Sequence, residues 1–514
     1  MAIKHRLLVF IIALAIFFRF YNFYDFQYWS GDEEVLTATI RHIIWDRSPT
    51  LLVQNASLGF GLGPFYHYFL TPFYYLTKFD LVNLQAIASV LGVITTFLVY
   101  KAGSEIGDKK LGLVASFLYA TSFFISLFDR RLVHLTLNPV LSALTLWSLM
   151  KVIKKDYRFL PLLAFPIGFA FHEDASLIAL VVAILITLAF FKVSLKNKYT
   201  AAGLVILGIF IMPFLMAEVR YHGVVSKAIV RSLARPIRPD MLPTDGKLYP
   251  PAEVIGVLTR VLFTAPSKFI EQNFCYCDVP LALFTPVTQL MVVIMLGISL
   301  YWLFSKKPPV WKMRLLWIMV FAFVISLYFY NIVFRGNFFQ HYFMVFYPIF
   351  IVLVAQVLVW IEQRAKWLMA AWLIFYFSVN LYTLVNSQVK YPLYQKINLI
   401  KNTTDAIGNE KFSLYASNDP YIHGGGWTEL YTLYFRPAVK SYHYRNWDWI
   451  YRAYSLFPTP IEDTDPKRVV VIKNRSDNWP GVNIELSKST YLDLEALVLD
   501  NSQQTFRSPD SQSQ

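Results

Sequence analysis

Long apolar runs alternate with short polar connections along most of this chain. Most of the runs have roughly the 17 to 25 residues that an α-helix needs to cross a hydrocarbon core of about 30 Å. They lie near residues 7–24, 80–100, 111–128, 137–153, 159–172, 174–191, 200–217, 284–304, 315–334, 342–361 and 367–385. The pattern therefore predicts an α-helical polytopic membrane protein with about eleven transmembrane helices.

Basic residues gather in alternate short connections, which predicts the orientation of the chain. The translocation machinery retains Lys and Arg on the cytoplasmic side. With Lys4 and Arg6 inside, the basic residues of every second connection also fall inside: Lys101, Lys109, Lys110, Lys151, Lys154, Lys155, Arg158, Lys192, Lys196, Lys198, Lys306, Lys307, Lys312, Arg314, Arg364 and Lys366. The opposite short connections hold chiefly Arg130, Arg131 and Arg335.

An odd number of spans places the C-terminus on the other side of the membrane. We therefore predict a multi-pass protein of the plasma membrane with a cytoplasmic N-terminus. The membrane domain would occupy residues 1–385, with two long outer loops at 25–79 and 218–283. Residues 386–514 have ordinary soluble composition and would form an extracytoplasmic domain. Any chemistry is then expected at the outer face.

The C-terminal domain carries its own secondary-structure signals. Residues 411–415 and 468–473 are rich in β-branched and aromatic side chains, which predicts strands. Residues 501–514 are polar and are predicted to be disordered. We expect a small α/β domain with a disordered tail.

Composition agrees with the membrane class and narrows the partners. Hydrophobic residues make up 56% of the 514 residues and charged residues 16%, with a mean hydropathy of +0.45. The net charge of +14 is largely explained by the cytoplasmic connections. The sequence contains no nucleic-acid-binding module, so we expect no nucleic acid partner. Cys275 and Cys277 alone supply too few ligands for a structural zinc site.

Two adjacent carboxylates follow the first apolar run. Asp32 and Glu33 would lie at the outer mouth of a membrane helix, where charge is costly unless it faces water, binds an ion or does chemistry. Asp32 could act as a general base, or it could be the N-cap of a helix that starts near Glu33. Glu33 could orient Asp32 or an acceptor, or it could complement the helix dipole.

Four segments follow one another in a characteristic order: the pair Asp32-Glu33, the stretch LGFGLGPFYHY at 58–68, residues 85–122 and the stretch HYFMVFYP at 341–348. In this order they resemble the GT-C glycosyltransferases of the protein O-mannosyltransferase and lipid A aminoarabinose transferase group. The resemblance covers about residues 1–385. It implies transfer of a sugar, with inversion, from a polyprenyl-phosphate donor to a lipid, glycan or protein acceptor at the outer face of the bilayer.

The residues themselves also favour a lipid-linked donor. Nucleotide sugars are cytosolic, whereas the candidate acids lie outside, and the chain has no P-loop or dinucleotide motif. Arg binds phosphate well because its guanidinium makes bidentate charge-assisted bonds. We predict donor-phosphate contacts from Arg231 and Arg235 in the second outer loop and from Arg335 and His341 in a later outer turn. The basic loop could instead attract anionic lipid headgroups.

Other polar residues could complete the site. Related transferases often carry an acid where Asn138 falls here, so a second acidic role could pass to Asp129, or to Glu173 and Asp174. The segment 172–174 could bind a divalent cation, or it could be a solvated turn between helices. No cofactor is otherwise predicted.

Aromatic and cationic residues near the span ends have alternative roles. Tyr66 and His67 lie in the same outer loop as the acids and could contact the sugar, although aromatic residues at span ends commonly form interfacial belts. Arg19 could extend to headgroups or reach the donor phosphate.

Two other functions remain open at the level of sequence. A glycolipid transporter or flippase would tend to show inverted repeats with charges near the bilayer midplane, and no such repeat is evident. An oligosaccharide ligase needs the same acids and cations as a single-sugar transferase, so the sequence does not separate these two.

Overall fold

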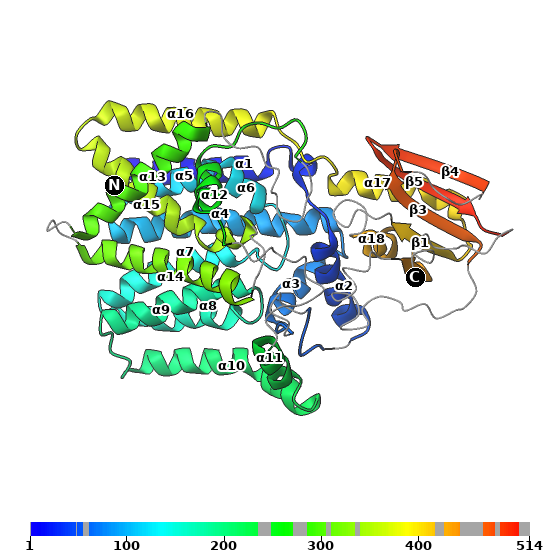
Figure 1. Cartoon of the computed structure of the whole chain (residues 1–514), viewed down its shortest axis with the longest axis horizontal. Helices are drawn as coiled ribbons and strands as arrows, with labels where there is room; N and C mark the ends of the chain where they lie inside the picture. Colours follow the sequence, from blue (N-terminus) through cyan, green and yellow to red (C-terminus); the bar gives the residue numbers. More distant parts are fainter. Residues whose placement is uncertain are drawn as a thin grey trace.

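A computed structural model describes residues 2–47, 49–54, 61–234, 248–270, 285–304, 310–334, 340–416, 426–442, 466–477 and 484–502. The described chain is mainly helical, with a bundle of long helices at one end and a small sheet at the other (Figure 1). This arrangement confirms the predicted fold class, an α-helical membrane domain followed by a small α/β domain.

The bundle follows the predicted apolar runs closely. Its long helices are α1 (Ala2–Phe20), α4 (Leu81–Ile106), α5 (Lys109–Thr121), α7 (Asn138–Ile153), α9 (Ile178–Phe190), α10 (Lys198–Arg220), α13 (Thr285–Phe304), α14 (Val310–Phe334), α15 (Tyr347–Glu362) and α16 (Lys366–Val385). Five helices of the described chain, α4, α10, α13, α14 and α16, are long and apolar enough to cross a membrane. The protein is therefore a multi-pass membrane protein, and the number of eleven spans stays a prediction.

Several predicted spans are interrupted by local features. The run 111–128 divides at Ser122, where α5 ends and the short helix α6 (Phe123–Phe128) begins, and the Ser122 hydroxyl accepts a bond from the Ile125 amide at 3.3 Å. The run 159–172 forms a 3₁₀ helix, η2 (Tyr157–Leu163), and the short α8 (Ala164–Phe169). Pro161 lies inside η2, where its missing N–H disfavours a continuous α-helix.

Helices α2 (Gly31–Trp45) and α3 (Phe65–Leu76) lie between the bundle and the sheet (Figure 1). The remaining short elements of the membrane domain are η1 (Phe23–Phe26), η3 (Ala175–Leu177), η4 (Gln340–Val345), α11 (Val224–Ala234) and α12 (Pro251–Leu262). The segment between α1 and α4 thus places helix α2, which carries Asp32, against the C-terminal domain.

The C-terminal domain packs α17 (Leu393–Ile407) and α18 (Trp427–Tyr434) with a five-stranded sheet of order β2-β1-β3-β5-β4. Its strands are β1 (Phe412–Ala416), β2 (Lys440–Tyr442), β3 (Arg468–Asn474), β4 (Ile484–Tyr491) and β5 (Leu494–Asp500). Strand β1 pairs in parallel with β2 and β3, while β5 runs antiparallel to β3 and β4. Both predicted strands are confirmed as β1 and β3. The tail predicted to be disordered lies outside the described residues from 503 onward.

Candidate active site

The first turn of α2 is closed by a capping box. Ser30 is the N-cap, and the Glu33 carboxylate accepts bonds from the Ser30 amide at 2.9 Å and from its hydroxyl at 2.6 Å. This pattern satisfies amide groups that a helix start leaves without partners. The alternative role of Asp32 as the N-cap is therefore wrong, because Ser30 fills that position. The Asp32 carboxylate is left for other contacts.

Arg131 joins the two acids from a turn far along the sequence. Its Nε donates to Glu33 Oε1, and its Nη2 lies 3.4 Å from Asp32 Oδ2. The guanidinium also stacks over the Tyr28 ring, 4.2 Å from its centroid. The side chains of Arg131 and Glu33 are almost wholly buried, at 3% and 2% exposure, while that of Asp32 keeps 12%. Asp32 is therefore the acid of this pair that is more open to a substrate.

The surroundings of Asp32 favour a basic carboxylate. Burial raises its pKa above the ordinary value of 3.8, electrostatic interactions with His134 and Arg131 lower it, and those with Glu33 and Asp174 raise it. A more basic carboxylate accepts a proton more readily, and nearby cations keep a fraction of it ionised. The same interactions place His134 and Asp174 close to Asp32, and His134 Nε2 lies 4.0 Å from Asp174 Oδ2.

Of the predicted phosphate ligands, His341 alone lies in this cluster within the described chain. It is buried in η4, within electrostatic range of Arg131 and His134. Arg231 is exposed on α11. Arg235 and Arg335 lie outside the described residues.

Tyr66 and His67 lie on α3 and are both buried. The Tyr66 hydroxyl donates to the Val133 carbonyl at 2.7 Å, so it holds the turn that carries Arg131. His67 is 1% exposed, and within the described chain neither ring nitrogen has a hydrogen-bond partner. Burial lowers the pKa of His67 to about 3, which leaves the ring neutral. Sugar contact by these two residues stays a prediction.

Asp129 is occupied by a different buried pair. Arg19 Nη2 lies 2.7 Å from Asp129 Oδ2, and the Arg19 side chain is fully buried. Arg19 also donates to the carbonyls of Ala15 and Ala120 at 3.2 and 3.1 Å. The expectation that Arg19 extends to headgroups is wrong, because the bundle encloses it. Asp129 is thus paired with Arg19, and its role as a second acid stays a prediction.

The three side chains of residues 172–174 each contact a different partner. His172 Nε2 lies 2.8 Å from the Phe210 carbonyl, and Glu173 accepts from the Leu137 amide at 2.7 Å, at the start of α7. Asp174 accepts from the Ser176 amide at 2.7 Å, at the start of η3. No group of three or more His, Cys, Asp or Glu able to hold a metal occurs in the described part of the chain.

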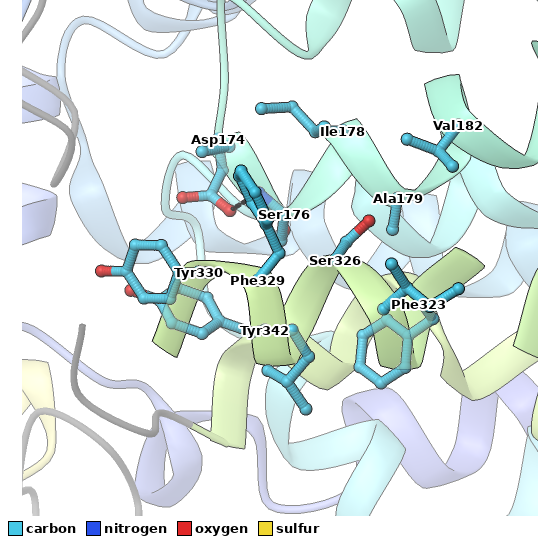
Figure 2. Close-up of a pocket in the computed structure, with 13 residues that line it drawn as sticks. Asp174, Ser176, Ile178, Ala179, Val182, Phe323, Ser326, Phe329, Tyr330 and Tyr342 are labelled. Atoms are coloured by element: carbon cyan, nitrogen blue, oxygen red, sulfur yellow. Dashed lines mark hydrogen bonds between the residues drawn. The ribbon is translucent and has the colours of Figure 1, made fainter. Parts of the chain in front are cut away.

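An apolar cleft of about 350 Å³ adjoins the acid cluster. It lies between α9 and α14, and Figure 2 shows Asp174, Tyr330 and Tyr342 toward one end and Val182 and Phe323 toward the other. Its lining is almost entirely hydrocarbon and aromatic. The cleft therefore suits a lipid chain whose polar end lies near Asp174.

Comparisons with known proteins agree with this architecture. Residues 62–216 match the family described as dolichyl-phosphate-mannose-protein mannosyltransferase. The crystal structure of ArnT from Cupriavidus metallidurans bound to undecaprenyl phosphate matches with a TM-score of 0.56 and 10% identity, over 97% of this chain and 99% of that one. The chain has the GT-C glycosyltransferase fold. The predicted resemblance to this group is thus confirmed, and the match extends through the C-terminal domain, for which the sequence had suggested no relative.

Weaker matches come from oligosaccharyltransferases of Archaeoglobus fulgidus. AglB in complex with an inhibitory peptide and a dolichol phosphate has a TM-score of 0.41 and 11% identity, over 92% of this chain and 69% of that one. The form tethered to an acceptor peptide has a TM-score of 0.45 and 12% identity, with the same coverage. No curated protein matches the sequence.

The role of Arg131 could not be predicted from the sequence. There Arg131 is only a basic residue of a short connection, yet in the structure it contacts Asp32 and Glu33. The sequence indicates only that Arg131 and His134 belong to a short polar turn between two apolar runs. Nothing in the sequence indicated which acids this turn would meet.

Proposed function

We propose that this protein is an inverting glycosyltransferase that takes a sugar from a polyprenyl-phosphate donor and transfers it to a lipid, glycan or protein acceptor. The observation that carries the proposal is the partly exposed Asp32 carboxylate, held beside Arg131 and His134 at the end of a GT-C bundle. The family match over residues 62–216 and the fold shared with ArnT support the class of reaction.

Asp32 acts as the general base in this proposal. It takes the proton of the acceptor hydroxyl while the acceptor oxygen forms a bond to the anomeric carbon. The bond between that carbon and the phosphate oxygen breaks, and polyprenyl phosphate leaves with the electron pair. A positioned carboxylate contributes about 10²–10⁴ in rate to such a step. Arg131 holds Glu33 and keeps a positive charge beside Asp32.

The donor enters from the bilayer with its hydrocarbon tail in the α9–α14 cleft. The cleft lining is suited to isoprenoid units, and Asp174 at its end interacts electrostatically with Asp32. His341 is the phosphate contact nearest to this cluster in the described chain, and we propose Arg231, Arg235 and Arg335 as further contacts with phosphate. ArnT, which shares the fold, was crystallised with undecaprenyl phosphate, a lipid of this chemical class.

The proposed orientation puts this chemistry outside the cell. The N-terminus is cytoplasmic, the C-terminal domain is extracytoplasmic, and the membrane is the plasma membrane. Support comes from the Lys and Arg asymmetry of the connections. Helix α2, whose first turn contains Asp32 and Glu33, lies with the C-terminal domain at one end of the bundle (Figure 1). External labelling of a tag after Gln514 in intact cells is expected, and labelling only after permeabilisation would contradict the orientation.

The activity is tested with full-length protein in lipid nanodiscs. A panel of polyprenyl-phosphate sugars is supplied, and products are followed by mass spectrometry. Asp32→Asn should lower kcat by about 10² or more, because the amide cannot take the proton. The control is Asp46→Asn at the far end of the same helix, where the Asp46 side chain is 57% exposed and its carboxylate lies 2.6 Å from His42 Nδ1.

Four outcomes separate the candidate functions and donors. Turnover of lipid-linked monosaccharides that is lost in Asp32→Asn supports the proposal. Transfer of whole oligosaccharides alone would instead favour a ligase. Movement of a glycolipid across the bilayer without any new glycosidic bond would favour a flippase, and turnover with a sugar nucleotide in lipid-free protein would overturn the lipid-linked donor.

A further inference from the structure

The helix that carries Asp32 is bound on its other side to the C-terminal domain. Its first turn contains three consecutive carboxylates, and the third, Glu34, is fully buried. Glu34 Oε2 accepts from the Gly426 amide at 2.9 Å, and Oε1 accepts from the Glu429 amide at 2.8 Å. These amides begin α18, so Glu34 caps a helix that lies 392 residues away in sequence.

A second contact lies two turns further along α2. Arg41 Nε donates to Glu429 Oε1 at 2.8 Å, and its Nη2 donates to Oε2 at 3.0 Å. Residues seven apart share one face of a helix, so Glu34 and Arg41 present a continuous polar edge to α18. Two contacts on one edge fix the rotation of α2 about its axis as well as its position.

The segment before α2 joins the same domain through Trp29. Its indole Nε1 donates to the Gly426 carbonyl at 2.8 Å, and Lys396 Nζ donates to the Trp29 carbonyl at 2.8 Å. Gly426 has a φ of +85°, and a Cβ there would lie 2.1 Å from Trp29 Nε1. Only glycine fits this position, because both the backbone conformation and the space exclude a side chain.

We propose that Glu34 is a positioning residue through which the C-terminal domain holds α2, and with it the Asp32 carboxylate, in the geometry that the reaction needs. The inference rests on the proposed function for the role of Asp32. Glu33 ties the first turn of α2 to the membrane domain through Arg131, and Glu34 ties the same turn to α18. Asp32 directly precedes these two anchors in the same helical turn, and its own contact with Arg131 is a longer one, at 3.4 Å.

The test compares Glu34→Gln and Gly426→Ala with Gly408→Ala in the full chain. Glutamine has one acceptor oxygen, so one of the two bonds to α18 is lost and an amide donor faces a backbone donor. Gly408 is the matched control, because it also has a positive φ of +56° in the same domain, yet a Cβ there would meet only the Asp405 carbonyl at 3.8 Å.

Two readouts are used. Hydrogen–deuterium exchange of the α2 amides, residues 31–45, reports how firmly the helix is held. Steady-state kinetics with polyprenyl-phosphate sugars report catalysis. Glu34→Gln and Gly426→Ala should both speed α2 exchange and lower kcat by about tenfold or more at nearly constant KM, since small displacements of a catalytic group are costly. Gly408→Ala should resemble the wild type in both.

Unchanged α2 exchange in folded Glu34→Gln and Gly426→Ala would overturn the inference. Faster exchange with unchanged kcat would also overturn it, because Asp32 would then not depend on the C-terminal domain. If Glu34→Gln does not fold, Arg41→Gln removes the second contact and is judged by the same outcomes. A wild type that turns over no donor would refute the proposed function, while the exchange data would still decide whether the C-terminal domain holds α2.

Discussion

Removing the positive charge of Arg131 should make Asp32 a base that works only at higher pH. The guanidinium lies 3.4 Å from the Asp32 carboxylate and lowers its pKa, against the larger effect of burial, which raises it. Without Arg131, the Asp32 pKa should rise. The acidic limb of the profile of kcat/KM against pH reports this group in the free enzyme, so the limb should move to higher pH.

The size of the shift follows from the geometry. An opposite charge at about 4–6 Å lowers a carboxyl pKa by about 1–3 units, and each unit corresponds to about 1.4 kcal/mol. Arg131→Gln alone would also leave Glu33 buried without its cation, at a cost of about 3–5 kcal/mol to folding. The double variant Arg131→Gln, Glu33→Gln removes both charges. Because Arg131 affects the Asp32 pKa more than Glu33 does, the double variant is expected to raise the Asp32 pKa.

The assay measures kcat/KM with a polyprenyl-phosphate sugar at several pH values, together with thermal unfolding to show that each variant is folded. Below the limb, a rise of one unit lowers the rate about tenfold. The control is Arg131→Lys, which keeps the positive charge, so its limb should stay near that of the wild type. A folded double variant whose acidic limb coincides with that of the wild type would refute the role given to Arg131.

Three further predictions concern stability and the cleft. Burial, opposed by Arg41, raises the pKa of Glu429 from 4.5 to about 7. The protonated carboxyl therefore makes its full contribution to the free energy of unfolding below pH 4.5, and this contribution falls by about 3 kcal/mol as the pH rises through 7. Glu429→Gln should therefore flatten the dependence of the unfolding temperature on pH between 5 and 8, and an equal slope would contradict this. Asp129→Asn should destabilise the bundle by about 3 kcal/mol, since it leaves Arg19 buried without its carboxylate; an unchanged unfolding temperature in detergent would argue against it. Ser326→Trp should fill part of the 350 Å³ cleft and raise KM for the lipid donor by roughly tenfold, about 1.4 kcal/mol, whereas an unchanged KM would place the tail elsewhere.

The helices of the membrane domain could be predicted from the sequence because their causes are local. A run such as 200–217 is apolar enough to form a membrane helix wherever it lies, and α10 (Lys198–Arg220) appears where the run predicts it. The strands β1 and β3 follow in the same way from β-branched and aromatic runs. The break between α5 and α6 was missed, because Ser122 is a weak signal inside an apolar run.

The Asp32-Glu33 pair was also visible in the sequence, because charge beside a membrane helix is costly and therefore conspicuous. The residues that surround this pair in the structure could not be predicted from the sequence. The partner of Glu33 is 98 residues away at Arg131, and the amide capped by Glu34 is 395 residues away at Glu429. Adjacent carboxylates in one helical turn point in different directions, and only the packing of the bundle and the C-terminal domain decides what each one meets. The sequence determined which residues are chemically able to act, and the tertiary structure decided which of them act together, because hydrogen bonds and ion pairs depend on distances that folding alone sets.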